Sequence, residues 1–228
     1  MTDDSKIGEA WSLPGVLGYF DTERSSTAQV YASEWIFLKD RLKEGMSVLD
    51  VGCAQGGFAA MLAENLKDFS YTGLDVSSDM ITRARVRFPR HSFHHVVGGD
   101  WGALGAARFD QVLVLGILHL HFGWRDTIAQ AWARTKSCLI LDLREIDGPT
   151  VEDQSRSYFK MDFGASDDRH AATTLPYVLV NAAEALATIR ALCPDAARIS
   201  HYGYLHPVSS SAVTPVGQAM ANVWCIER

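Results

Sequence analysis

A short apolar run at residues 48–51 contains an acid and is followed by glycines, a combination suited to binding a nucleotide-like ligand. A strand here would deliver Asp50 at its carboxyl end, and Gly52 would allow the tight turn that follows. Gly56 and Gly57 have no Cβ, so their backbone can lie against a ligand, and a helix opening behind them would present unpaired N–H groups. This order of features predicts the first loop of a doubly wound sheet, where nucleotide-like cofactors bind.

The charge of Asp50 helps to decide which nucleotide this loop would bind. The spacing Gly52-x-Ala54-x-x-Gly57 resembles the dinucleotide fingerprint with its middle glycine replaced by alanine. Asp50 lies two residues before the first glycine, where a dinucleotide-binding strand is usually apolar. An acid there attracts the sulfonium and ammonium groups of S-adenosylmethionine and repels a pyrophosphate. The pattern resembles motif I of the class I S-adenosylmethionine-dependent methyltransferases, so we predict S-adenosylmethionine as the cofactor and S-adenosylhomocysteine as the product.

The resemblance covers residues 46–145 and implies roles for acids at the ends of two further strands. Asp75 ends the strand expected at residues 71–75, where it would accept hydrogen bonds from both ribose hydroxyls; capping of the next helix is the alternative. Asp100 follows the strand expected at residues 93–97 and would bind the adenine amino group, or else begin a turn. The other contacts that the resemblance implies are Cys53, Val76, Met80, Gly99, Leu115 and Trp101, the last stacked on the adenine ring.

Two histidines, His119 and His121, come soon after the strand expected at residues 109–115. Either is a candidate for the general base that removes a proton from a methyl acceptor, although a packing or turn role would suit both. Tyrosine and arginine side chains suit a partly polar acceptor pocket. The candidate acceptor-binding residues are Tyr19, Arg144, Tyr177 and Tyr204, with a structural role as the alternative for each.

Composition and absent motifs disfavour several classes of function. The net charge of −6 argues against a nucleic-acid substrate, which would favour a basic surface. No Asn/Asp-Pro-Pro-aromatic run follows residues 109–115, which disfavours methylation of an adenine or glutamine amino group. Gly116 and Ile117 stand where metal-dependent catechol-type enzymes carry a carboxylate, and the four cysteines form no CxxC pair. We therefore predict a small-molecule partner and no metal.

A regular alternation of strands and helices would position these residues and predicts a parallel sheet with right-handed crossovers. The resemblance implies an α/β, Rossmann-like, seven-stranded and mostly parallel sheet with an antiparallel last strand and helices on both faces. The remaining strands are expected at residues 137–143, 197–205 and 218–226. Helices are expected at residues 26–43, 125–136 and 181–192, from apolar periodicity and capping signals.

A single methyltransferase domain is expected over residues 1–228. It would comprise an N-terminal arm and helix at 1–45, the cofactor-binding core at 46–145, a substrate-covering insertion at 146–180, and a C-terminal helix with closing strands at 181–228. The first residues lack the basic and apolar regions of a signal peptide, and no apolar run is long enough to span a membrane. We expect a cytoplasmic protein without a membrane partner.

These features predict methyl transfer from S-adenosylmethionine to a small molecule, with a hydroxyl of a sugar or natural-product scaffold as the favoured acceptor. A protein or RNA methyltransferase is an alternative that would need a basic or grooved rim. A protein that binds the cofactor without turnover is a second alternative. A nicotinamide-dependent enzyme on the same fold is a third, against which Asp50 argues.

Overall fold

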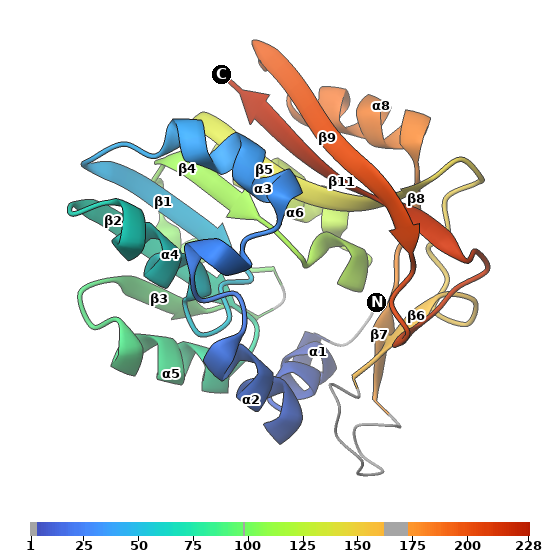
Figure 1. Ribbon diagram of the computed structural model, residues 1–228, viewed down its shortest axis with the longest axis horizontal. Coiled ribbons are helices and arrows are strands. Elements are labelled where there is room, and N and C mark those ends of the chain that lie inside the picture. The colour runs from blue at the N-terminus through green and yellow to red at the C-terminus, as the bar shows by residue number, and fades with distance from the viewer. Residues whose placement is uncertain (1–3, 98, 162–172) are drawn as a thin grey trace.

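The computed structural model describes residues 4–97, 99–161 and 173–228, in which a central sheet is flanked by helices (Figure 1). The main path of the sheet has the order β3-β2-β1-β4-β5-β11-β9. Its strands are β1 (Met46–Val51), β2 (Phe69–Asp75), β3 (Ser92–His95), β4 (Phe109–Val114), β5 (Thr135–Ile146), β9 (Arg198–Pro207) and β11 (Gln218–Glu227).

The pairing of these strands is mostly parallel. β1 pairs in parallel with β2 and β4, β2 with β3, and β4 with β5. β11 is antiparallel to both of its neighbours, β5 and β9. A short strand, β8 (Val180–Asn181), adds a parallel pairing with β5, so the described part of this sheet has eight strands where seven were expected. The predicted Rossmann-like sheet with an antiparallel last strand is confirmed.

Helices cover both faces of the sheet, which is why its central strands are apolar on both sides. Val48 and Leu113 pack toward α4 (Gly57–Asn65) and α5 (Ser78–Arg87), whereas Leu49 and Val112 pack toward α6 (Trp124–Ala133) and α8 (Ala182–Leu192). All four of these side chains are fully buried. The crossovers therefore bring the loops after β1, β2 and β4 to one edge of the sheet.

Two N-terminal helices and a small second sheet cover this edge (Figure 1). The helices are α1 (Asp4–Trp11) and α2 (Pro14–Thr22), and the small sheet consists of β6 (Tyr158–Lys160), β7 (Thr174–Pro176) and β10 (Ala212–Val213). Ile7, Leu17, Met161 and Leu175 belong to one apolar cluster that joins these elements. Residues 162–172 of the predicted covering insertion lie outside the described residues.

The helix predicted over residues 26–43 was wrong in its extent. The chain there forms 3₁₀ turns at Thr27–Gln29 and Lys39–Arg41 around a short helix, α3 (Ala32–Leu38). The backbone at Tyr31 is extended, with φ −64° and ψ 144°. The Gln29 side chain bonds the backbone of the preceding segment, accepting from Ser25 N and donating to Thr22 O.

The other predicted helices differ less from the structure. The helix predicted over residues 125–136 ends at Ala133, because the chain enters β5 at Thr135, whose hydroxyl donates to Ala131 O. The helix predicted over residues 181–192 is confirmed as α8. Asn181 Oδ1 caps it by accepting from the N–H groups of Ala183 and Glu184 at 3.0 and 3.2 Å.

Among the described residues, no helix combines the length and apolarity needed to cross a lipid bilayer.

The tight packing of β4 generates a stability prediction. Replacing the fully buried Leu113 by alanine leaves a cavity between the sheet and its helices, so the free energy of unfolding should fall by about 2–5 kcal/mol. Urea denaturation would measure this change. Val86→Ala is the control, because Val86 is 81% exposed on α5 and should change stability by less than about 0.5 kcal/mol. Equal effects of the two substitutions would contradict the assigned packing.

Candidate functional site

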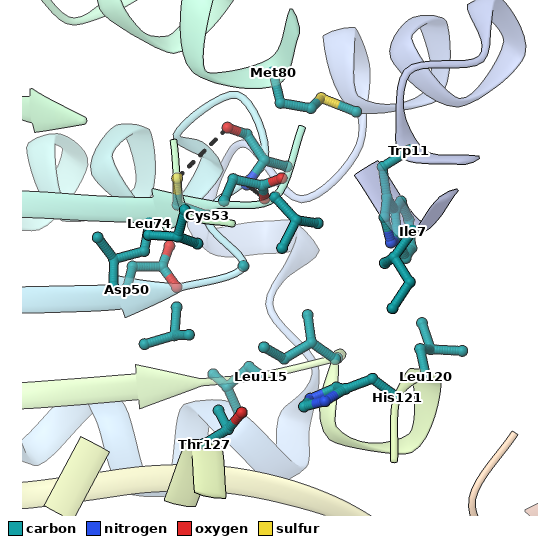
Figure 2. A pocket seen from close by; sticks show the side chains of 18 of the residues that line it. Ile7, Trp11, Asp50, Cys53, Leu74, Met80, Leu115, Leu120, His121 and Thr127 are labelled. Carbon is teal, nitrogen blue, oxygen red and sulfur yellow. Dashed lines mark hydrogen bonds between the residues drawn. The ribbon is translucent and has the colours of Figure 1, made fainter. Parts of the chain in front are cut away.

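A cavity of about 890 Å³ lies at the carboxyl ends of β1, β2 and β4, beneath the N-terminal helices (Figure 2). Except for Gly56 and Asp100, every residue predicted to bind the cofactor lines it. Tyr19, Arg144, His119 and His121 also line it, although the sequence places them in three separate regions. The parallel crossovers thus bring most of the predicted site together.

The turn after β1 has the backbone conformation that its glycines make possible. Gly52 and Gly56 have φ angles of 79° and 82°, in the left-handed region that favours glycine. A Cβ on Gly57 would lie 2.1 Å from the backbone oxygen of Arg24, so the N-terminal segment packs directly on this turn. A Cβ on Gly56 would instead meet the ring of Phe88, so Gly56 shapes the turn and does not line the cavity.

Asp75 joins the turn after β1 to the segment after β2. Its two carboxylate oxygens accept hydrogen bonds from Ala54 N at 2.8 Å and Ser77 N at 2.9 Å. Burial raises the pKa of Asp75, and these two backbone donors partly offset that rise. Each oxygen keeps further acceptor capacity, so the carboxylate can bind two neighbouring hydroxyls of a ligand in the cavity.

Asp50 lines the same cavity and is held by a tyrosine that sequence reasoning missed. The Tyr71 hydroxyl donates to Asp50 Oδ2 at 2.5 Å, and both side chains are buried. Burial raises the pKa of Asp50 to about 7, while the hydrogen bond from Tyr71 and the charge of Arg24 act in the opposite direction. Tyr71 occupies an ordinary β2 position, and only the β1–β2 register brings it to Asp50.

Asp100 and Trp101 differ in their placement. Trp101 is 4% exposed and lines the cavity, and its stacking on adenine stays a prediction. Asp100 is exposed, and its Oδ1 accepts a hydrogen bond from Gly102 N at 2.7 Å. The structure therefore places Asp100 in the alternative role of a turn residue, because a short acid readily bonds the backbone two residues ahead.

Two of the four predicted acceptor-binding residues line the main cavity, and the other two do not. Tyr19 and Arg144 line the main cavity. Tyr177 is buried behind them, with its ring 5.2 Å from that of His119 in a T-shaped contact. Tyr204 is 44% exposed and lines a separate pocket of about 160 Å³. Tyr177 can thus support the cavity wall, whereas Tyr204 lies outside that cavity.

His119 is neutral at physiological pH. It is 7% exposed, and within the described residues its buried Nδ1 atom has no hydrogen-bond partner. Burial and the nearby charge of Arg144 lower the pKa of His119 to about 3. A neutral imidazole can donate or accept one hydrogen bond, but this environment disfavours its protonated form.

Two largely buried ion pairs flank the cavity, and neither was predicted from the sequence. Arg24 Nη2 lies 2.8 Å from Glu34 Oε1, and Arg144 Nη1 lies 2.5 Å from Asp142 Oδ2. Asp142 Oδ1 also accepts from Gly116 N at 2.6 Å. The only sequence signal for the first pair was an acid within the otherwise apolar helix Ala32–Leu38.

In the described part of the chain, no group of three or more histidine, cysteine or acidic side chains is arranged to hold a metal ion.

Comparison with known proteins yields a family model and several relatives. A methyltransferase domain model matches residues 49–139. A trans-aconitate 2-methyltransferase of Rhodopseudomonas palustris is 29% identical over 93 residues, which are 41% of this chain and 34% of that protein. A fatty-acid O-methyltransferase of Mycolicibacterium smegmatis is 44% identical over 86 residues, which are 34% of this chain and 29% of that protein. The matched segments therefore span about a third of the length of these relatives.

Solved structures share the fold over nearly the whole chain. The magnesium protoporphyrin IX methyltransferase from Synechocystis PCC 6803, determined with bound S-adenosylmethionine, has a TM-score of 0.56 and 16% identity, and covers 100% of this chain and 99% of its own. The [4+2]-cyclase SpnF has a TM-score of 0.62 and 15% identity, and covers 98% and 96%. The methyltransferase domain model thus matches the segment that carries the glycine turn and Asp75, and over the whole chain the solved structures are similar in fold.

Proposed function

We propose that the protein transfers a methyl group from S-adenosylmethionine to an oxygen atom of a small molecule. One observation carries this proposal: Asp50, Asp75 and the glycine turn all line the same cavity. All of them lie in the segment that the methyltransferase domain model matches. The relatives named for trans-aconitate and fatty-acid methylation support a small-molecule acceptor. The size of the cavity, about 890 Å³, also suits two small ligands.

The residues of the cavity fit this cofactor. Asp75 would accept hydrogen bonds from the ribose hydroxyls, and Asp50 would lie near the cationic amino-acid portion. Met80 and Trp101 are buried apolar side chains that would flank the adenine. When bound, the cofactor supplies a methyl group already activated on sulfur, so the protein's contribution is mainly to orient the acceptor and exclude water.

The nature of the acceptor oxygen bears on the role of His119. A hydroxyl acceptor, such as a sugar or natural-product scaffold, was predicted from the sequence and stays a prediction. Methylation of a hydroxyl would require a group that takes up the hydroxyl proton. His119 suits this role poorly, because its environment disfavours the protonated imidazole. His121 also lines the cavity and stays a candidate for that role.

One observation favours a second candidate function. SpnF, a structural neighbour named as a [4+2]-cyclase, shows that this fold also occurs in a protein with a different named activity. A protein that binds S-adenosylmethionine without transferring its methyl group therefore stays an alternative. It predicts binding without formation of S-adenosylhomocysteine.

Calorimetric titration with S-adenosylmethionine, S-adenosylhomocysteine and NAD tests the cofactor assignment. We expect the two adenosyl ligands to bind and NAD not to bind. Asp75→Ala should weaken adenosyl binding roughly 10- to 100-fold, because hydrogen bonds to a carboxylate contribute about 1.5–3 kcal/mol. Asp79→Asn is the matched control, since Asp79 is exposed in the first turn of α5. NAD binding, or equal loss in both variants, would contradict the proposal.

The raised pKa of Asp50 predicts that cofactor binding depends on pH. Its pKa is about 7 in the free protein, and the cationic cofactor favours the ionised form. Below pH 7 a proton must leave on binding, so the affinity should fall by up to about tenfold per pH unit as the pH decreases.

Tyr71→Phe tests the cause of this pH dependence. It removes a hydrogen bond that lowers the pKa of Asp50, so the midpoint should move to higher pH. Asp50→Asn should bind more weakly and lose the pH dependence. An unchanged midpoint in Tyr71→Phe would show that another group titrates.

A further inference from the structure

The arginines Arg24 and Arg144 face the main cavity, whereas their carboxylate partners do not. Both arginines line the main cavity, whereas Glu34 and Asp142 line only the smaller neighbouring pocket, which Arg144 also reaches. In each pair the arginine side chain is more exposed than the acid: 20% for Arg24 against 3% for Glu34, and 16% for Arg144 against 6% for Asp142. A ligand in the main cavity therefore meets the cationic side of both pairs.

The acids that line the main cavity lie mostly elsewhere. Asp50 and Asp75 belong to the proposed cofactor site. Asp126 is in the first turn of α6, the helix whose Gln130 bonds Gly99 O after β3. Half-buried Glu23 is the neighbour of Arg24 in sequence, and its charge acts on Tyr19. The cavity thus combines the acids of the proposed cofactor site with two arginines, of which Arg24 lies near enough to Asp50 for its charge to lower the pKa of that acid.

Both guanidinium groups are fixed in place and retain hydrogen-bond donors. Arg24 uses Nη2 for Glu34 and lies over the ring of Tyr31, with its Cζ 4.9 Å from the ring centroid. Arg144 uses Nη1 for Asp142 and also hydrogen-bonds the side chain of Tyr177. Since a guanidinium carries five N–H donors, each arginine can bind an anion without reorganising.

The cavity continues from these charges into an apolar region. Ile7, Trp11, Leu120 and Phe159 line it and belong to, or pack against, one apolar cluster. Figure 2 shows Ile7, Trp11 and Leu120 on the side of the cavity away from Asp50 and Cys53. An acceptor with an anionic head and an apolar body would match both parts of this surface.

We infer that the methyl acceptor is a carboxylic acid with an apolar body, whose carboxylate is held by Arg144 and Arg24 and is itself methylated. This inference rests on the proposed methyl transfer. A carboxylate oxygen forms the new bond to the methyl carbon as the methyl–sulfur bond breaks, and that bonding pair remains on sulfur. The anionic acceptor and the sulfonium become a neutral ester and a thioether, so no proton moves. Neutral His119 would then donate a hydrogen bond and need not act as a base.

Matched acids and amides test the inference by binding. Octanoate and phenylacetate, with octanamide and phenylacetamide as neutral analogues, are titrated into the protein saturated with S-adenosylhomocysteine. We expect each acid to bind at least tenfold more tightly than its amide. With S-adenosylmethionine, the acids that bind should yield methyl esters detected by mass spectrometry, and 1-octanol should yield no ether.

Three variants connect the acid preference to Arg144. Asp142→Asn/Arg144→Gln removes both charges together, so no lone carboxylate stays buried, and it should reduce the preference at least threefold, with Arg24 still in place. Arg144→Lys keeps the cation and should retain part of it. Arg198→Gln is the control with no expected change, because Arg198 is 71% exposed in its pair with Glu227.

The inference would be overturned if the amides bound equally or more tightly, or if no acid bound at millimolar concentration. A preference for acids that is unchanged by the double substitution would also overturn it. Absence of S-adenosylhomocysteine binding in the unmodified protein would instead contradict the proposed function. The two failures are therefore distinguishable.

Discussion

The carboxylate of Asp75 is the interaction on which the geometry of the site depends. It accepts N–H groups from the turn after β1 and from the start of α5, so one side chain fixes two loops that come from neighbouring parallel strands. Ala54, one of its partners, has a φ of 45°, a conformation that non-glycine residues seldom adopt without such a constraint. Because the β1–β2 register places Val51 beside Leu74, the two strands end together and the loops can share this acid.

The cavity above this turn brings together charges that would be costly to bury alone. Asp50 is satisfied by Tyr71, and two arginines are each paired with a carboxylate on the side away from the main cavity. Pairing limits the cost of removing these charges from water. Burial in a medium of low dielectric strengthens the electrostatic interaction of each charge with a ligand in the cavity. The same cavity therefore holds the acids of the proposed cofactor site and the two arginines to which we assign the acceptor carboxylate.

The N-terminal helices complete the cavity through contacts that bring distant segments together. The backbone oxygen of Arg24 packs on Gly57, and Gln55 Nε2 donates to Leu17 O at 2.8 Å. Arg24 is held in turn by Glu34 of α3. The arm is thereby tied to the cofactor turn itself, which links the proposed acceptor and cofactor sites physically.

The sequence by itself determined the alternation of strands and helices, the glycine turn, and the acids at the ends of β1 and β2, because these depend on local residue types and spacing. Tertiary structure decided the rest. Tyr71 reaches Asp50 only through strand register, and the segment predicted as one helix at residues 26–43 is divided by the extended backbone of Tyr31. The neutral state of His119 follows from burial beside Arg144, a proximity that depends on β5 lying next to β4. Such long-range contacts arise from packing, and no single segment of sequence encodes them.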